Sequence, residues 1–182
     1  AVILPLSSFA QGVDFKSLTM KEAQVVAVKE KKMIFIDFYT TWCGPCKMMA
    51  EKVLPLKEVG EYMNERFVCV KYDTGADKDG SELAKMFNVQ AYPTFLILNV
   101  DKGLENQIVG ATLEPLDFMN QVEAALKASL ASLGQQYANG NRDVSFLTDY
   151  LKQRYRIRSI SSKYRLIQVY ADPDDGAIQV MP

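Results

Sequence analysis

One stretch of this sequence, MIFIDFYTTWCGPCK at residues 33–47, joins the pattern of a buried strand to a closely spaced pair of cysteines. Its first half, Met33–Tyr39, is a nearly continuous run of apolar, β-branched and aromatic residues, which is typical of a strand covered on both faces. Its second half holds Cys43 and Cys46, and a helix is expected to begin there. A Cys-x-x-Cys pair between a strand and a helix indicates a redox-active dithiol.

The spacing of the two cysteines predicts a different role for each sulfur. Cys43 is expected to cap the N-terminus of the helix, and Cys46 to lie one turn further in. Unpaired N–H groups and the positive end of the helix dipole favour the thiolate form of Cys43. We therefore expect Cys43 to attack a disulfide of a substrate. Cys46, expected to be the more buried sulfur, then attacks Cys43 and resolves the mixed disulfide.

Two other uses of a Cys-x-x-Cys pair are a structural zinc site and a static disulfide. Structural zinc takes four ligands, whereas the sequence has three cysteines and no histidine, so no metal site is expected. A small, odd number of cysteines cannot form a disulfide framework either. The third cysteine, Cys69, lies inside another apolar run, and we expect an inert core thiol there rather than a regulatory one.

Composition limits the remaining classes of function. The 182 residues are 48% apolar and 24% charged, which is typical of a soluble globular protein with one full domain and part of a second. Lys and Arg number 21 against 22 Asp and Glu, so no broad field for nucleic acid or an anionic membrane is expected. The absence of histidine excludes Ser-His-Asp and Cys-His catalysis. No apolar run reaches the ~18 residues of a transmembrane segment.

Hydrophobic periodicity predicts an α/β fold, with helices on both faces of a sheet. A capping box at Thr19–Glu22 precedes a helix over residues 23–31. The expected strands are Met33–Tyr39, Phe67–Asp73, Thr94–Asn99 and Leu104–Val109, and the other helices are residues 47–64, broken or kinked near Pro55, 81–87 and 115–127.

The two ends of the chain differ from this pattern. Residues 1–12 begin with an apolar run and small residues before Gln11, which resembles the end of a signal peptide that lacks its basic segment. We therefore expect export to the periplasm, with a disordered or strand-forming end in a cytoplasmic protein as the alternative. Residues 13–127 form the expected redox domain. Residues 128–182 are predicted to be a helical C-terminal extension: residues 128–137 continue the closing helix, and Asp143 caps a new one with an apolar stripe from Val144 to Tyr155.

The run Trp42-Cys43-Gly44-Pro45-Cys46-Lys47 resembles the active site of the thioredoxin family, and the resemblance covers residues 19–127. It implies the thioredoxin fold, a central mixed sheet with helices on both faces, and chemistry without a cofactor beyond the Cys43–Cys46 disulfide. Asp37 stands where this family keeps a buried carboxylate that accepts the proton of Cys46, and burial raises a carboxyl pKa toward a useful range. Lys71 matches a lysine near that carboxylate, a support for the proton relay, with an exposed strand-end lysine as the alternative.

Ala91-Tyr92-Pro93-Thr94 matches the cis-proline loop of the same family. The resemblance implies a substrate-binding surface formed by Trp42, Gly44, Pro45, Tyr92, Pro93 and Gly110. One departure is Glu51, which stands where thioredoxins usually have a kinking proline. Residues 53–55 and 61–68 look more like exported thioredoxin-like proteins and the soluble domain of the DsbD electron carrier.

The expected function is that of a thiol–disulfide oxidoreductase that reduces protein disulfides in the cell envelope and so maintains redox homeostasis there. Its expected partners are proteins with disulfides and a membrane-bound or soluble electron donor, with no nucleic acid among them. One alternative reverses the direction to a disulfide oxidase or isomerase. Another is a non-catalytic interaction module that docks a partner through Trp42, Pro45 and Tyr92.

Overall fold

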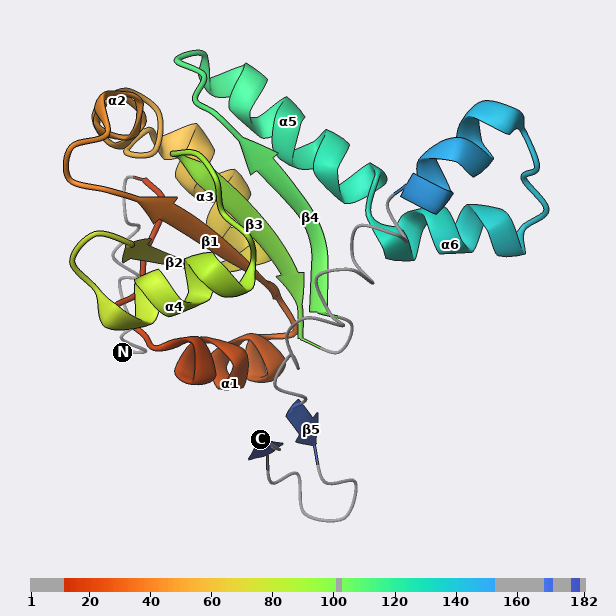
Figure 1. The fold of residues 1–182 in the computed structure, drawn as a ribbon, viewed down its shortest axis with the longest axis horizontal. Helices are drawn as coiled ribbons and strands as arrows, with labels where there is room; N and C mark the ends of the chain where they lie inside the picture. Colours follow the sequence, from red (N-terminus) through yellow and green to blue (C-terminus); the bar gives the residue numbers. More distant parts are fainter. Residues whose placement is uncertain (1–11, 101–102, 153–168, 172–177, 181–182) are drawn as a thin grey trace, which may run out of the picture.

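The computed structural model describes residues 12–100, 103–152, 169–171 and 178–180. A mixed four-stranded sheet in the order β2-β1-β3-β4 forms its centre (Figure 1). Its strands are β1 (Met33–Tyr39), β2 (Phe67–Asp73), β3 (Thr94–Asn99) and β4 (Gly103–Val109). β1 pairs in parallel with β2 and antiparallel with β3, and β4 pairs antiparallel with β3. Because β1 has neighbours on both sides, its apolar run occupies the interior of the sheet, as its sequence predicts.

Helices cover both faces of this sheet, which confirms the α/β prediction. The helices are α1 (Met20–Glu30), α2 (Gly44–Lys52), α3 (Lys57–Arg66), α4 (Lys78–Met86) and α5 (Pro115–Lys127). Ala23 and Ala27 of α1 and Ala84 of α4 belong to one apolar cluster, with Ile34 and Ile36 of β1. Side chains of α2, α3 and α5 form the other cluster around Phe35 on the opposite face. Because side chains alternate along a strand, Asp37 lies on the same face as Phe35, toward α2.

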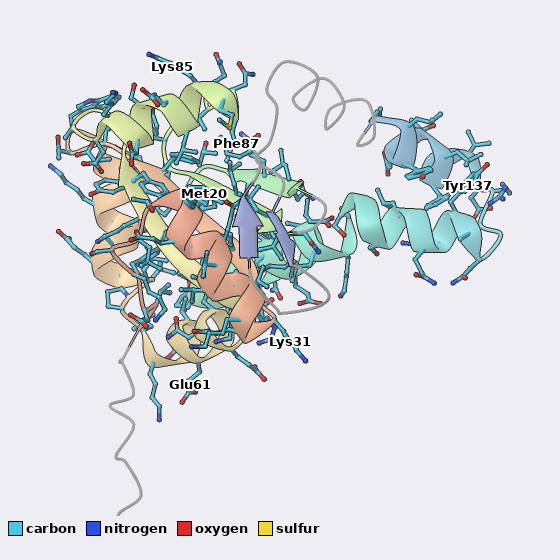
Figure 2. All side chains as sticks on the ribbon, turned by 90° about the horizontal axis from the view of Figure 1, so that it is seen from below. Met20, Lys31, Glu61, Lys85, Phe87 and Tyr137 are labelled. Carbon is cyan, nitrogen blue, oxygen red and sulfur yellow. A yellow bond between two sulfur atoms is a disulfide. The ribbon has the colours of Figure 1, made fainter. Side chains whose placement is uncertain are left out.

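Charged side chains lie on the outer surfaces of these helices. In Figure 2, Lys31, Glu61 and Lys85 extend outward, and all three are exposed. Met20 and Phe87 instead pack against the apolar cluster under α1 and α4. Burying an apolar side chain of this size contributes roughly 1.5–3 kcal/mol. Because the apolar side chains of each helix face the sheet and the charged ones face solvent, the helix has one orientation on the sheet.

The start of α1 and the break after α2 follow the sequence closely. Glu22 N–H donates to Thr19 Oγ1 at 3.3 Å and Thr19 N–H donates to the Glu22 carboxylate at 2.8 Å, so the predicted capping box is confirmed. The expected helix over residues 47–64 is divided into α2 and α3 at Pro55. Proline has no N–H to continue the helix, and the N–H groups of Val53 and Leu54 both donate to the carbonyl of Met49.

The region after residue 127 differs from the prediction in three respects. The closing helix does not continue; a separate helix α6 (Leu130–Ala138) begins where Ser129 Oγ accepts the N–H of Ser132 at 3.1 Å. Residues 144–152 are helical after Asp143, as expected, but Val144 and Leu151 are exposed, so this part of the predicted stripe is not buried. Two short strands, β5 (Val169–Ala171) and β6 (Ile178–Val180), pair antiparallel and were not predicted. Tyr155 lies outside the described residues.

The structure also places the start of one helix earlier than the sequence predicts. Helix α4 begins at Lys78, one turn before the expected residue 81. The signal-peptide prediction covers residues 1–12, of which residues 1–11 lie outside the described residues. Among the helices that the structure describes, none combines the length and the hydrophobicity of a membrane-crossing segment.

The segment at residues 12–16 is anchored across α3 and β2. Val13 N–H donates to the Leu54 carbonyl at 2.8 Å, and Lys16 N–H donates to the Cys69 carbonyl at 2.9 Å. Asn64 Nδ2 donates to the carbonyl of Gly12 at 2.9 Å. These bonds hold Gly12 so close to Gly60 of α3 that a Cβ atom built on Gly60 would lie 2.6 Å from the Cα of Gly12.

We predict that Gly60→Ala destabilises the protein by roughly 1–3 kcal/mol, because the new methyl group meets backbone that cannot move freely. Gly134→Ala in α6 is the matched control: nothing lies within 4 Å of the added Cβ, so better helix propensity should leave stability unchanged or raise it by up to about 1 kcal/mol. Urea unfolding followed by circular dichroism measures both variants. Stabilisation by Gly60→Ala would contradict the close packing of these two glycines.

Candidate active site

Cys43 and Cys46 form a disulfide at the N-terminus of α2. Their sulfur atoms are 2.03 Å apart and their Cα atoms 5.3 Å apart. Cys43 is the N-cap of α2, and its Sγ accepts the N–H of Cys46 at 3.1 Å. Pro45 lies in the first turn, where its missing N–H costs no hydrogen bond. In the reduced protein, an N–H donor at this helix end favours a thiolate at Cys43.

The two cysteines do not differ in burial as expected. Cys43 is 4% exposed and Cys46 is 7% exposed. The prediction that Cys46 is the more buried of the two is therefore wrong for this disulfide form. The hydrogen bond from the N–H of Cys46 holds the sulfur of Cys43 against the first turn of α2. Cys46 lines a cavity next to this end of the helix.

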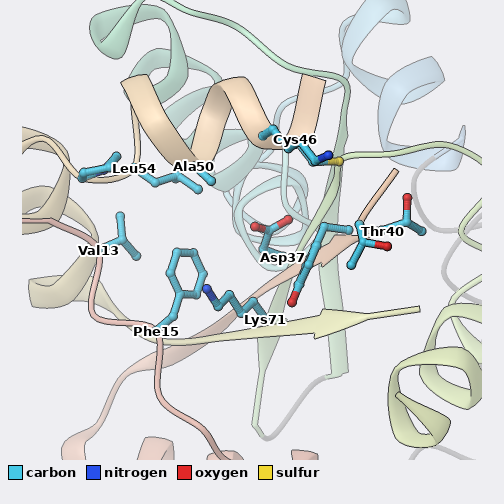
Figure 3. Close-up of a pocket in the computed structure, with 12 residues that line it drawn as sticks. Val13, Phe15, Asp37, Thr40, Cys46, Ala50, Leu54 and Lys71 are labelled. Atoms are coloured by element: carbon cyan, nitrogen blue, oxygen red, sulfur yellow. The ribbon is translucent and has the colours of Figure 1, made fainter. Parts of the chain in front are cut away.

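Asp37 lies in this cavity, beneath the start of α2. The cavity has a volume of about 640 Å³ and is also lined by Cys46, so the carboxyl group and the resolving sulfur share one space (Figure 3). Asp37 is 8% exposed. Burial raises the pKa of this carboxyl group from 3.8 to about 7, while the positive charge of Lys71 acts in the opposite direction. The structure thus places a buried carboxyl group that titrates near neutral pH in the same cavity as Cys46.

Lys71 lies at the rim of the same cavity. Its Cα is the register partner of Asp37 in the parallel pairing of β1 and β2. Its ammonium group is 5.6 Å from the ring centroid of Phe15, and the residue is exposed. Lys71 therefore acts on Asp37 through its charge from the edge of the cavity.

The remaining predicted residues lie on the outer side of the disulfide. The Tyr92–Pro93 peptide bond is cis, and the rings of Trp42 and Tyr92 meet edge to face with centroids 5.9 Å apart. Gly110 N–H donates to the Pro93 carbonyl at 2.9 Å, which joins two loops. Gly110 has a φ of +100°, a conformation that favours glycine.

This outer side is open to a partner. Trp42 is 73% exposed, and Gly44 and Pro45 are exposed beside it. The structure thus joins Trp42 to Tyr92 and Gly110 to Pro93, which is itself buried. It places Asp37, Lys71 and Cys46 together in the cavity.

Nine of the twelve residues that line the cavity were not predicted as site residues, Thr40, Val13 and Phe15 among them. Thr40 is 3% exposed, and its hydroxyl group has no hydrogen-bond partner among the described residues. Val13 and Phe15, from the segment before α1, supply apolar walls. The only signal for Thr40 is its place between the strand and the cysteines, whereas Val13 and Phe15 reach the site through a pairing distant in sequence, Phe15 with Cys69.

Cys69 itself is a core residue. It is 1% exposed, and burial raises the pKa of its thiol to about 12. A thiol with such a pKa contributes almost no thiolate at neutral pH. Within the described part of the chain, no group of three or more Cys, Asp or Glu side chains is arranged to hold a metal ion.

Comparisons with known proteins agree on one family. The family model named thioredoxin matches residues 15–123. Chloroplastic thioredoxin Y from Oryza sativa subsp. japonica is 32% identical over 117 residues, which cover 64% of this chain and 65% of that protein. The chain thus spans slightly less than two thirds of this relative.

Solved structures give the same result. A candidate disulphide-isomerase from Bacteroides thetaiotaomicron is 36% identical with a TM-score of 0.58, over 65% of this chain and 96% of that chain. A thioredoxin from Thermus thermophilus is 25% identical with a TM-score of 0.52, over 60% of this chain and 87% of that chain. Each similarity covers about two thirds of this chain or less.

The buried carboxyl group makes stability depend on pH. A pKa of about 7 in place of 3.8 means that native Asp37 keeps a proton that the unfolded chain loses between these two values. The stability that neutral Asp37 provides is therefore complete below about pH 4 and is lost as pH rises through 7. Above pH 7 the native protein holds a buried charge, which is unfavourable.

We predict that Asp37→Asn becomes progressively more stable than the parent protein between pH 4 and pH 8, by roughly 2–4 kcal/mol over that range. Urea unfolding of the oxidised proteins at pH 4, 6 and 8 measures the difference. Asp149→Asn, which changes an exposed carboxyl group, should show no such trend. If Asp37→Asn and the parent protein lose stability in parallel, the carboxyl group is not held neutral by burial.

Proposed function

Because this chain belongs to the thioredoxin family, we propose that it is a thiol–disulfide oxidoreductase that reduces disulfide bonds of other proteins. The observation that carries this proposal is the position of the Cys43–Cys46 disulfide between an open surface and a buried carboxyl group. A static disulfide needs neither a proton acceptor beside one sulfur nor an exposed docking surface beside the other. The structure holds the disulfide form of the pair, through which disulfide exchange passes in either direction.

The first step belongs to Cys43. In the reduced protein its sulfur stays at the N-terminus of α2, where the N–H of Cys46 stabilises a thiolate. The thiolate attacks one sulfur of the substrate disulfide, forms a mixed disulfide and releases the other substrate sulfur as a thiolate. That thiolate takes up a proton from solvent.

The second step belongs to Cys46 and Asp37. The ionised carboxylate of Asp37 accepts the proton of the Cys46 thiol, and the Cys46 thiolate attacks Cys43. A disulfide forms between the two cysteines, and the second substrate sulfur leaves as a thiolate. Two electrons pass to the substrate in total, and one proton remains on Asp37 until it returns to solvent. Because attacker and target are three residues apart, the step is intramolecular and rapid.

The outer surface supplies the docking site for the substrate. By the resemblance to thioredoxins, the backbone of Tyr92 faces the disulfide, and the ring of Tyr92 contacts that of Trp42, which precedes Cys43. An extended peptide can pair with this backbone while an apolar side chain contacts the exposed ring of Trp42. Such recognition uses main-chain groups chiefly, so it suits many protein substrates.

The pair must be returned to the dithiol form by a donor of two electrons and two protons. We propose a protein dithiol for this role, because it can use the same docking surface and the same exchange chemistry. We also propose that the cycle operates in the cell envelope, on the basis of the signal-peptide pattern at residues 1–11. A reductive role there requires a donor that carries electrons across the membrane.

A second candidate function is disulfide isomerisation. The similar protein from Bacteroides thetaiotaomicron, named as a candidate disulphide-isomerase, favours it. The two activities differ in their need for Cys46. An isomerase can attack and release a substrate through one thiolate alone, whereas net reduction requires the second cysteine to take the disulfide away.

We predict that Cys43→Ser abolishes the dithiothreitol-driven reduction of a model protein disulfide, because no thiolate starts the exchange. Reduced Cys46→Ser, freed of dithiothreitol before the substrate is added, should instead stop at a mixed disulfide between Cys43 and the substrate, visible by mass spectrometry of the unreduced protein. Cys69→Ala is the matched control and should keep turnover within about twofold, since this thiol is buried in the core.

Three results would contradict parts of this proposal. Turnover by Cys43→Ser would remove Cys43 from the mechanism. Rearrangement of a scrambled disulfide protein by Cys46→Ser at the parent rate would favour isomerisation over reduction. Absence of any exchange in the parent protein, with partner binding unchanged when both cysteines are replaced, would indicate an interaction module.

A further inference from the structure

The cavity beside α2 is larger than the transfer of a proton requires. Its volume of about 640 Å³ lies within the ~300–1,000 Å³ that small-molecule sites occupy. Figure 3 shows Ala50 and Leu54 above this space, with Val13 and Phe15 facing them from below. These four apolar side chains come from two parts of the chain that are far apart in sequence. An apolar body that covered them would remove their surface from water, which is favourable.

The same cavity carries positive charge. Lys47 from α2 and Lys71 from β2 both line it, and the ammonium group of Lys71 is 5.6 Å from the ring centroid of Phe15. Within the described part of the chain, neither lysine forms an ion pair. Asp37 is the one acidic residue among the described lining residues, and burial raises its pKa to about 7. At neutral pH the two cations therefore outweigh the carboxyl group.

We propose that this cavity is a binding site for a small organic anion, whose apolar body packs against Phe15 and Leu54 and whose acidic group lies near Lys47 and Lys71. Apolar walls with a few charged groups at one side are the usual form of such a site. The binding itself does not depend on the proposed function. Its effect on catalysis does, because a ligand in this space lies against Cys46, which lines the cavity.

Binding of an anion and ionisation of Asp37 oppose each other. Ionised Asp37 repels a negative ligand in the same cavity, so the ligand binds more tightly while the carboxyl group is neutral. By reciprocity, the bound ligand raises the pKa of Asp37. Less carboxylate is then available at neutral pH to accept the proton of Cys46. In the proposed function the ligand is thus an inhibitor of the resolving step.

The other groups around Asp37 keep their charge between pH 5 and pH 9. The charged or titratable ones are Lys71 from β2, Tyr39 from its own strand, and Lys47 from α2. Lysine titrates above this range, and burial raises the pKa of Tyr39 above its usual value of 10. Cys46 is held in the disulfide, and the register partner from β3 is the apolar Phe95. A pH dependence of anion binding in this range therefore reports on Asp37.

Two fluorescent probes separate the apolar contribution from the charge. Anilinonaphthalene sulfonate is an anion, and phenylnaphthylamine is the same aromatic body without the sulfonate group. Both fluoresce more strongly in apolar surroundings, so titration of the oxidised protein gives a dissociation constant for each. At pH 6, where Asp37 is mostly neutral, we expect both to bind and the anion to bind more tightly.

The first variant removes one cation from the cavity. Lys47→Gln should weaken binding of the sulfonate probe by roughly two- to fivefold, because a partly exposed ion pair contributes little more than this. The neutral probe should bind as before. Lys52→Gln is the matched control: it removes an exposed lysine of the same helix that is not among the lining residues. Neither dissociation constant should change in this control.

The second variant fills the space. Ala50 lines the cavity from α2 and is exposed at its mouth, so Ala50→Trp places an indole ring where the probes bind. Both probes should bind about tenfold more weakly or worse, since a filled site has no room for them. Ala138→Trp, the same change at an exposed position of α6, should leave both dissociation constants unchanged.

The third measurement tests the coupling to Asp37. The sulfonate probe should bind roughly two- to fivefold more weakly at pH 8.5 than at pH 5.5, whereas the neutral probe should show no change. In Asp37→Asn the affinity for the sulfonate probe should not depend on pH. Saturating sulfonate probe should also slow the resolution of a preformed mixed disulfide at pH 7 in the parent protein, but not in Ala50→Trp.

Equal weakening by Lys47→Gln and Lys52→Gln would overturn the inference, and so would full binding to Ala50→Trp, because the probe would then lie elsewhere on the surface. Absence of binding to the parent protein would overturn it as well. An unchanged resolving rate with bound probe would remove the inhibitory role. The titrations use oxidised protein without substrate, so they stand apart from the proposed function. Loss of turnover in the parent protein would contradict that function and leave the binding site standing.

Discussion

The site depends on one constraint: the chain leaves the centre of the sheet at the end of β1 and must begin α2 within a few residues. β1 is paired on both sides, so a carboxyl group on it is buried wherever it faces the helix layer. The start of α2 leaves N–H groups unpaired, and the sulfur of Cys43 accepts one of them. One short connection thus places the sulfur of Cys43 at a helix N-terminus and, beneath the next turn, a buried carboxyl group with a pKa of about 7.

In the proposed mechanism, this arrangement separates recognition of the substrate from proton transfer. The cis-proline loop and Trp42 lie on the exposed side of the disulfide, where a peptide can approach. Asp37 and Thr40 lie on the other side, in a cavity that a substrate does not need to enter. In this arrangement the buried carboxyl group, once ionised, destabilises the native state above neutral pH. In the proposed mechanism burial of this group is useful, because a carboxylate exposed to water has too low a pKa to accept a proton from a thiol efficiently.

Much of the fold could be predicted because it is encoded locally. The runs at Met33–Tyr39, Phe67–Asp73 and Thr94–Asn99 match β1, β2 and β3 in the structure, since β-branched and aromatic residues mark buried strands over a few positions. The capping box at Thr19 and the break at Pro55 are equally local. At Ser129 the sequence permits either a continued helix or a new one, and the side-chain cap selects the latter. The exposed Val144 and Leu151 show that a helical apolar stripe predicts amphipathicity but not which partner covers it.

The functional site likewise combines residues that are close in sequence with residues that only the fold brings together. Cys43, Cys46 and Asp37 belong to one stretch of sequence, so their proximity follows from the strand-to-helix pattern. The walls of the cavity do not, because Phe15 reaches it by pairing with Cys69, far along the chain. The relative burial of the two cysteines depends on which loops cover the disulfide, and spacing carries no information about that. Thr40 was missed because an unpaired hydroxyl group is recognisable only when its surroundings are known.

The reduction potential of the Cys43–Cys46 pair, measured by equilibration with glutathione, tests most directly whether this pair reduces protein disulfides. The account predicts a value near about −270 mV, that of thioredoxin, and a value at or above about −180 mV, that of protein disulfide isomerase, would contradict it.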